Sequence, residues 1–117
     1  MASFNGNQMM PSYNKKSCIF FNKLDMILGW NGIYATKRAE YKIKTLGYFV
    51  DYYEPLKNIV IEWDEEHHYN VDGTLKIKDC AREKEIISEL NCKFFRIRES
   101  CFDEEKFIND ILVEGKI

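Results

Sequence analysis

Several acidic residues and two histidines lie at the ends of apolar segments in the middle of the chain, where they could act together. Asp51 falls within the segment GYFVDYY, and Glu62 and Asp64 close the next one, NIVIEWD. His67 and His68 follow almost directly. Carboxylates at the ends of neighbouring strands can share one divalent cation, because hard cations select oxygen ligands. Such a pair with a nearby histidine is suited to metal-assisted hydrolysis of a phosphodiester bond.

Strands and a helix are needed to position these residues, and the sequence predicts both. Residues 48–53 and 58–63 are rich in β-branched and aromatic residues, and the segment EPLKN between them predicts a hairpin. Apolar residues at helical spacing predict a helix from residue 77 to about residue 91, and residues 93–98 predict another strand. A strand, helix, strand unit implies that the last strand pairs in parallel with the second.

Two further helices are predicted before the first strand. From Ser17, apolar residues recur at a spacing of three to four until Gly29, which indicates a helix packed on the core. The next helix is predicted from Thr36, a suitable N-cap, to Gly47, which suits the left-handed C-terminal position. Glu40 would lie on this helix.

The predicted fold is an α/β domain with the element order α, α, β, β, α, β, α. Its mixed sheet combines a hairpin with a parallel crossover strand, and helices flank the sheet. Ser100 and Asp103 resemble a capping box for the final helix. Residues 1–16 are polar and aperiodic, and we expect a flexible tail or linker remnant there. Residues 17–117 would form one domain, since a chain of 117 residues suffices for a single core.

Composition limits the classes of protein to which the chain can belong. No apolar segment approaches the roughly 20 residues of a membrane span, and no secretion signal is evident, so we expect an intracellular, cytoplasmic protein with no membrane partner. Four cysteines without zinc-ligand spacing are expected to be reduced and mostly buried. The net charge of −2 argues against a surface that binds polyanions everywhere. Basic residues surround the acidic segment 62–66, however, which suits a site that holds a cation and binds phosphates.

Four short motifs, in this order, resemble the restriction-endonuclease-like superfamily, whose core motif is written PD-(D/E)xK. They are RAEY, GYFVDYY, NIVIEWDEEHHY and KDCAREKEI, and the resemblance runs from about Ser17 to Arg98. The match is closest to the branch related to very-short-patch-repair (Vsr) nucleases, called EDxHD and found in some homing endonucleases. Where the wider superfamily often has lysine, this chain has Asp64, so the resemblance does not extend to that lysine.

The resemblance implies a catalytic set made of Glu40, Asp51, Glu62, His68 and Asp79. Asp51 and Glu62 would hold Mg²⁺ or Mn²⁺ as the cofactor. His68 would take a proton from the attacking water or stabilise the transition state, and Asp79 would hold its imidazole in the productive tautomer.

Alternatives remain open for several of these residues. His67 is the fallback for the histidine, and Asp64 is the fallback for a carboxylate. Arg82 and Arg96 are candidates for binding DNA phosphates, although each could equally be a structural partner of the acids. Glu40 either completes the metal shell or faces solvent beside neighbouring lysines.

The predicted function is that of a divalent-metal-dependent endonuclease domain that acts on double-stranded DNA, as in a homing-type endonuclease. A Vsr-like mismatch-nicking repair enzyme is the second hypothesis. A non-catalytic nucleic-acid-binding module of the same fold, or a protein-interaction domain with an acidic patch, is the alternative from a different class. Because the sequence has no recognisable zinc finger, helix-turn-helix or basic arm, sequence specificity would come from a separate DNA-binding domain or from a homodimer.

Overall fold

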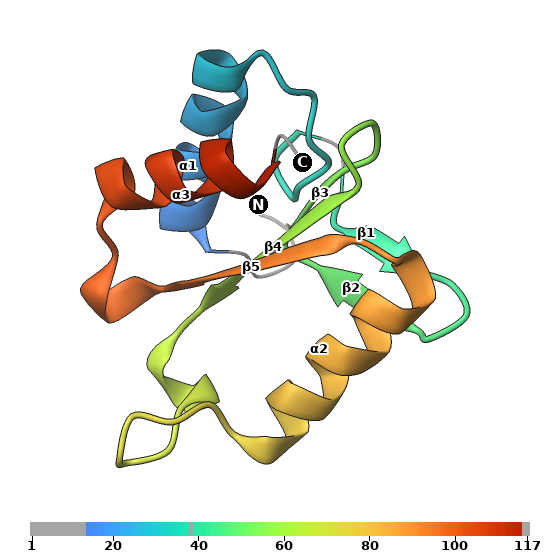
Figure 1. Ribbon diagram of the computed structural model, residues 1–117, viewed down its shortest axis with the longest axis vertical. Coiled ribbons are helices and arrows are strands. Elements are labelled where there is room, and N and C mark those ends of the chain that lie inside the picture. Colours follow the sequence, from blue (N-terminus) through green and yellow to red (C-terminus); the bar gives the residue numbers. More distant parts are fainter. Residues whose placement is uncertain (1–13, 38, 116–117) are drawn as a thin grey trace, which may run out of the picture.

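Three α-helices and two small sheets make up the part of the chain that the computed structural model describes, residues 14–37 and 39–115 (Figure 1). The elements follow in the order α1 (Lys15–Leu28), β1 (Tyr41–Ile43), β2 (Tyr48–Val50), β3 (Tyr52–Glu54), β4 (Ile59–Asp64), the 3-10 turn η1 (Glu66–His68), α2 (Ile77–Leu90), β5 (Lys93–Arg98), the 3-10 turn η2 (Glu99–Cys101) and α3 (Glu104–Gly115). Within the described ranges, no helix is long and apolar enough to cross a membrane.

The larger sheet has the strand order β3, β4, β5 and is mixed, as the sequence predicts. Strands β3 and β4 form the predicted antiparallel hairpin, and β5 pairs with β4 in parallel after the crossover through α2. In this register Glu62 lies opposite Arg96. The predicted α/β class with a hairpin and a parallel crossover strand is therefore confirmed.

Helices cover both faces of this sheet. Helices α1 and α3 lie on one face and α2 lies on the other (Figure 1). Strand β4 is buried on both faces, as its almost continuous apolar sequence predicts, and it separates two hydrophobic clusters. The larger cluster joins α1, α3 and the sheet and includes Phe20, Phe21, Leu24, Tyr52, Ile59, Ile61, Trp63 and Ile111. The smaller cluster, under α2, contains Ile43, Val50, Val60 and Ile86.

The predicted helix from Thr36 to Gly47 is wrong, and a second sheet stands in its place. Strands β1 and β2 pair in antiparallel and are joined by a turn at residues 44–47. Gly47 does adopt the left-handed conformation, with φ 74°, but as the end of this turn. The buried residues Ile43 and Val50 alternate with exposed ones, and this period of two is that of a strand. Glu40 lies just before β1 and not on a helix.

One strand and one helix cap also differ from the prediction. The expected single strand over residues 48–53 is divided at Asp51, where the chain bends between β2 and β3. The capping box at Ser100 is also wrong, because the Asp103 carboxylate accepts the N–H of Lys106 and so caps α3 itself. The Ser100 hydroxyl donates instead to Glu66.

Helix α1 begins earlier than the predicted domain boundary at residue 17. Asn14 is its N-cap, and the Asn14 side chain accepts the N–H of Ser17. The other end of the helix is predicted well, since Gly29 is the left-handed C-cap. Residues 1–13 of the predicted tail lie outside the described residues.

The four thiols are free, as expected, but they are not mostly buried. Cys18 is buried and Cys92 is half-buried, whereas Cys80 and Cys101 are exposed. The prediction of burial is therefore wrong for two of the four, because both exposed residues lie in or beside helical turns whose outer faces meet solvent.

Candidate functional site

A cavity of about 350 Å³ opens at the C-terminal end of β4. Its walls come from the start of α1, the end of β4, the turn η1 and the first turns of α2, together with the chain on both sides of the β1–β2 hairpin. The lining residues are Asn14, Ser17, Cys18, Ala35, Glu40, Asp51, Glu62, Trp63, Asp64, Glu65, His68, Asp79, Arg82 and Arg96. All five residues of the predicted catalytic set therefore reach one cavity, although their roles stay predictions.

Strand β4 presents its acids to this cavity because alternate residues of a strand share a face. Ile61 and Trp63 belong to the larger hydrophobic cluster, on the side of α1 and α3. Glu62 and Asp64 lie on the opposite side, where Arg82 of α2 and Arg96 of β5 meet them. One strand thus contributes an apolar face to the core and an acidic face to the cavity.

Asp51 lies at the bend between β2 and β3 and is bonded across to β4. Its Oδ2 accepts the N–H of Trp63 at 2.8 Å, and its own N–H donates to Glu62 Oε1 at 3.1 Å. Burial, with a smaller contribution from the Glu40 carboxylate, raises the pKa of Asp51 to about 6. The hydrogen bond from the Trp63 N–H acts in the opposite direction and lowers this pKa. A negative charge on Asp51 is therefore unfavourable, mainly because the side chain is buried and also because the Glu40 carboxylate is near.

Glu62 is almost completely buried, with 8% of its side chain exposed. Burial is the main cause that raises its pKa to about 7, and the charge of Asp51 adds to it. Arg82 opposes this shift through an ion pair in which Nη2 lies 2.8 Å from Glu62 Oε2. A single guanidinium therefore offsets only part of the negative charge that Asp51 and Glu62 place together.

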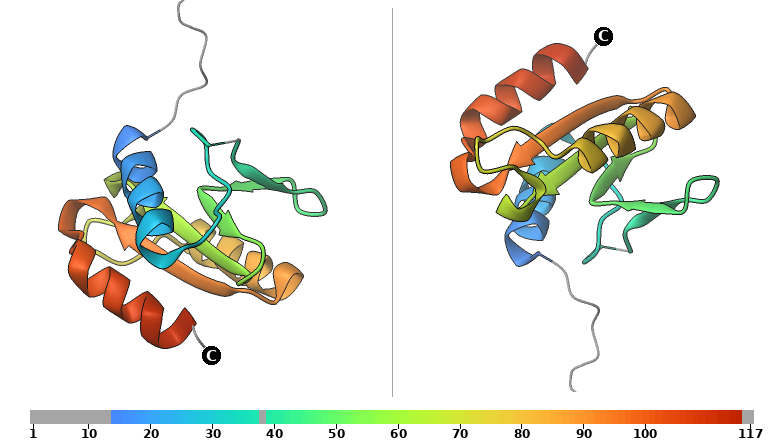
Figure 2. Two further views of the ribbon diagram at one scale, coloured as in Figure 1. Left: turned by 90° about the horizontal axis from the view of Figure 1, so that it is seen from above. Right: turned by 90° about the horizontal axis from the view of Figure 1, so that it is seen from below.

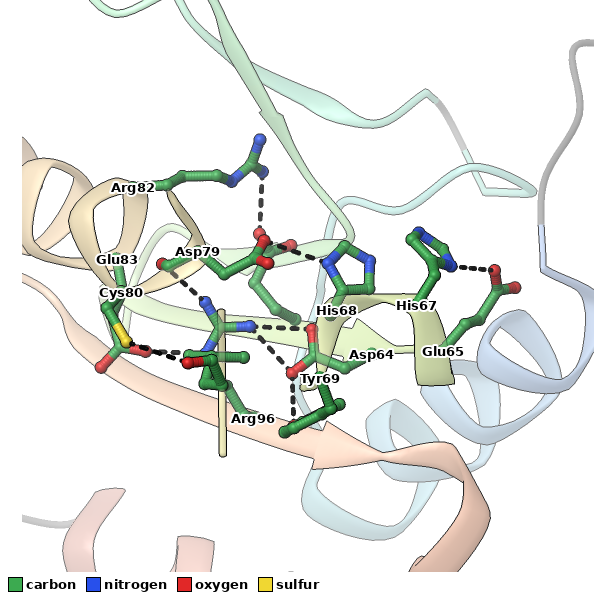
Figure 3. Close-up of polar contacts among 12 residues, drawn as sticks. Asp64, Glu65, His67, His68, Tyr69, Asp79, Cys80, Arg82, Glu83 and Arg96 are labelled. Atoms are coloured by element: carbon green, nitrogen blue, oxygen red, sulfur yellow. Dashed lines mark hydrogen bonds and ion pairs between the residues drawn. The ribbon is translucent and has the colours of Figure 1, made fainter. Parts of the chain in front are cut away.

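His68 and Asp79 form the pair that the sequence predicts. Nδ1 of His68 lies 3.0 Å from Oδ1 of Asp79, and Figure 3 shows the imidazole turned toward this carboxylate. Oδ2 of Asp79 is buried and has no hydrogen-bond partner among the described residues. Since an ionised carboxylate accepts and does not donate, this contact favours the tautomer that has its proton on Nδ1 and leaves Nε2 as the acceptor.

His67 does not join the cavity. Its Nδ1 lies 3.8 Å from Glu65 Oε1, and 67% of its side chain is exposed. In Figure 3 its ring lies toward Glu65 and away from Asp79. The geometry favours His68 over the fallback.

The two arginines line the cavity but are bound to its acids. Arg82 Nη2 also donates to the carbonyl of Phe49. Arg96 Nη1 lies 2.8 Å from both carboxylate oxygens of Asp64, and its Nε lies 2.7 Å from Glu83 (Figure 3). Both arginines are thus structural partners of the acids, which is one of the two predicted alternatives. Phosphate binding by either one stays a prediction.

Asp64, the fallback carboxylate, is fully engaged. Besides the two bonds from Arg96, its Oδ2 accepts the hydroxyl of Tyr69 at 2.9 Å. A buried carboxylate with this many donors has little capacity left for a cation. Its position suits a structural role that holds β4, β5 and the loop after η1 together.

The donor set is suited to a hard divalent cation at Asp51 and Glu62. Both supply carboxylate oxygens, and both have raised pKa values that a bound cation would reverse. Glu40 is close enough to Asp51 to raise its pKa, so it is available as a further ligand. Within residues 14–37 and 39–115, however, no group of three or more acidic, histidine or cysteine side chains is already arranged to hold a metal ion.

Sequence reasoning missed the contribution of α1 to the site. The Asn14 amide donates to Glu65 Oε2 at 2.7 Å and to Glu99 Oε1 at 2.9 Å, and Glu99 also accepts the indole N–H of Trp63. This network joins the start of α1 to the end of β4. The signal was present, because asparagine is a preferred N-cap and a helical pattern follows it.

Comparisons with protein-family models, with curated proteins and with solved structures each give no significant match.

Proposed function

We propose that this chain is the catalytic domain of a divalent-metal-dependent DNA endonuclease with a restriction-endonuclease-like core. One observation carries the proposal: Asp51, Glu62, His68 and Asp79 come from four separate segments and line a single cavity. The mixed sheet with helices on both faces supports the proposed core. The Vsr-related EDxHD branch, and within it a homing-type enzyme, is the proposed family.

Asp51 and Glu62 would hold Mg²⁺ or Mn²⁺ in this mechanism. Bound there, the cation would polarise the phosphate and lower the pKa of a coordinated water. Nε2 of His68 would accept the proton of the attacking water, since Nδ1 is held by Asp79. Asp79 positions His68 and stabilises the imidazolium that results.

Arg82 competes with the proposed metal for Glu62. The guanidinium bonded to Glu62 occupies one of the oxygens that a metal would use. Its side chain is 29% exposed, so it can move toward solvent or toward a phosphate when a cation binds. Arg82 could then serve the predicted phosphate-binding role in the substrate complex.

Supercoiled plasmid DNA provides the direct test. We expect nicking or linearisation with Mg²⁺ or Mn²⁺ and no cleavage with EDTA. Asp51→Asn and His68→Ala should each lower the rate by roughly 100-fold or more, whereas the matched control His67→Ala should retain wild-type activity. Products bearing a 5′-phosphate or a 3′-phosphate would identify the bond that is broken.

A non-catalytic nucleic-acid-binding module of the same fold is the second candidate. The lack of a preformed three-ligand metal group in the described part of the chain favours it. It predicts DNA binding without cleavage in any metal, in the wild type and in Asp51→Asn alike.

The endonuclease proposed above would act on DNA inside the cell. A homodimer or a separate domain would supply its sequence specificity.

A further inference from the structure

The side chains that line the cavity carry an excess of negative charge, which by itself does not attract DNA. Six carboxylates line it, from Glu40, Asp51, Glu62, Asp64, Glu65 and Asp79, against the two guanidinium groups of Arg82 and Arg96. Both arginines already form ion pairs with carboxylates. Even one bound divalent cation would leave an excess of acids, so the attraction for a polyanion must come from cationic residues outside the cavity.

The β1–β2 hairpin begins and ends at the rim of this cavity. Glu40, directly before β1, and Asp51, directly after β2, are both lining residues. Figure 2 shows the hairpin extending away from the three-stranded sheet in both views. The hairpin is therefore within reach of a nucleic acid that has one of its phosphates in the cavity.

The outer face of the hairpin has the chemistry needed to bind a phosphate backbone. Lys42 and Phe49 are cross-strand partners, and both are exposed. The ammonium group of Lys42 lies 5.7 Å from the centroid of the Phe49 ring. Lys44, in the turn that follows β1, is also exposed. An aromatic side chain that is 51% exposed beside Lys42, with Lys44 in the adjoining turn, offers an apolar surface and two cations within one small element.

The inner face fixes the hairpin to the site. Ile43 and Val50 are buried in the smaller cluster, and the ring of Tyr41 stacks on that of Tyr53 at a centroid distance of 4.5 Å. Arg82 binds the carbonyl of Phe49 and the carboxylate of Glu62 through the same Nη2. The element is thus held in place before any ligand arrives, which lowers the entropic cost of binding.

We propose that the outer face of the β1–β2 hairpin, defined by Lys42, Lys44 and Phe49, binds the sugar-phosphate backbone of duplex DNA beside the cleaved bond. The lysines contact phosphates, and Phe49 packs against a deoxyribose. Strand residues rise by about 3.3 Å, so Lys42 lies within two or three nucleotides of a phosphate in the cavity. The identity of the ligand rests on the proposed function.

Salt-dependent DNA binding tests this surface independently of cleavage. A fluorescently labelled 20-base-pair duplex is titrated in EDTA over a range of salt concentrations, with Lys42→Gln, Lys44→Gln and Phe49→Ser. Lys57→Gln is the matched control, because Lys57 is exposed in the turn before β4, at the opposite end of the sheet from the cavity. Circular dichroism verifies the fold of each variant.

Each lysine variant should bind several-fold more weakly, and the slope of log K against log salt should fall in magnitude by about 0.9 for each phosphate that the variant no longer binds. Phe49→Ser should weaken binding without changing the slope, and Lys57→Gln should behave as the wild type. Wild-type slopes in both lysine variants, or an equal decrease in Lys57→Gln, would overturn the inference. So would a wild-type protein that does not bind the duplex.

Plasmid cleavage by the same proteins separates this inference from the proposed function. If the hairpin variants lose affinity and the wild type never cleaves, the DNA surface stands and the nuclease proposal fails. If the wild type cleaves and the hairpin variants bind and cleave as well as it does, the nuclease proposal stands and the hairpin surface is wrong.

Discussion

The residues of strand β4 alternate between two faces along its six positions, and the two faces have different roles. The apolar face, formed by Ile59, Ile61 and Trp63, packs against α1 and α3 in the larger hydrophobic cluster. On the acidic face, Glu62 and Asp64 border the cavity. Burial stabilises the fold on one side and destabilises charged carboxylates on the other. Truncation of Ile61 should therefore lower the free energy of unfolding, whereas removal of the charge of Glu62 should raise it.

The largest effect is expected on the apolar face. Ile61 is fully buried, and Ile61→Ala should lower the free energy of unfolding by about 3 kcal/mol, because the variant buries less apolar surface and leaves a cavity. Urea unfolding measures this, and Ile61→Val should cost about 1 kcal/mol as the graded control. A decrease smaller than that of the valine variant would contradict the account of this face.

On the acidic side of the sheet, Asp79→Asn should reduce cleavage by about 10- to 100-fold with little change in stability. Asp72→Asn, in an exposed loop, is the matched control. A cleavage rate equal to that of the wild type would mean that Asp79 does not position His68 for the reaction.

The acidic face should make the metal-free protein more stable in mild acid than at pH 8. In the unfolded chain both carboxyls titrate near pH 4, whereas in the folded protein the pKa of Asp51 is about 6 and that of Glu62 is about 7. The folded state therefore binds protons more tightly, so this contribution is fully present below about pH 4 and is lost as the pH rises through 6 and 7.

Glu62→Gln isolates this effect. A change of one in pKa corresponds to about 1.4 kcal/mol, so we expect the variant to be more stable than the wild type at pH 8 by about 1 to 3 kcal/mol. The difference should decrease as the pH is lowered and vanish below about pH 4. Thermal unfolding between about pH 4 and 8 measures it, and Mn²⁺ should stabilise the wild type at pH 8 and not the variant. A variant less stable than the wild type at pH 8 would show that the Arg82 ion pair outweighs burial.

The smallest effect is expected at the N-terminal end of α1. Asn14→Ala should lower the free energy of unfolding by about 1 kcal/mol, because it removes the N-cap. Asn14→Ser should recover most of this, since serine also caps a helix, although it lacks the amide that donates to Glu65 and Glu99. Equal decreases in both variants, by chemical unfolding, would assign the stability to the hydrogen bonds of the amide.

Much of the fold could be predicted because most elements carry a local signal. Helices α1 and α2 show an apolar face at helical spacing, and Gly29 and Asn91 end them in the left-handed conformation. The segment 36–47 was mispredicted because Thr36 and Gly47 have the residue types of helix ends, while the strand pattern between them is only three residues long. The alternation that defines β1 and β2 becomes evident only once the two are paired.

The site could be predicted as a set of residues but not as a set of interactions. The four motifs name Glu40, Asp51, Glu62, His68 and Asp79, and all of them line the cavity. The ion pairs of Arg82 and Arg96 join residues 20 and 32 positions apart in the sequence. Such pairs depend on how β4, β5 and α2 pack, and neither periodicity nor residue type encodes that packing locally.

The position of a bound metal shows whether Asp51 and Glu62 form a metal site. A crystal structure with Mn²⁺, located by its anomalous scattering, should show the ion in the cavity between the carboxylates of Asp51 and Glu62, with Arg82 moved away from Glu62. Nε2 of His68 should face the side of the cavity that holds the ion. An ion bound elsewhere, or a cavity that stays empty at saturating Mn²⁺ with the Arg82 ion pair intact, would contradict the account.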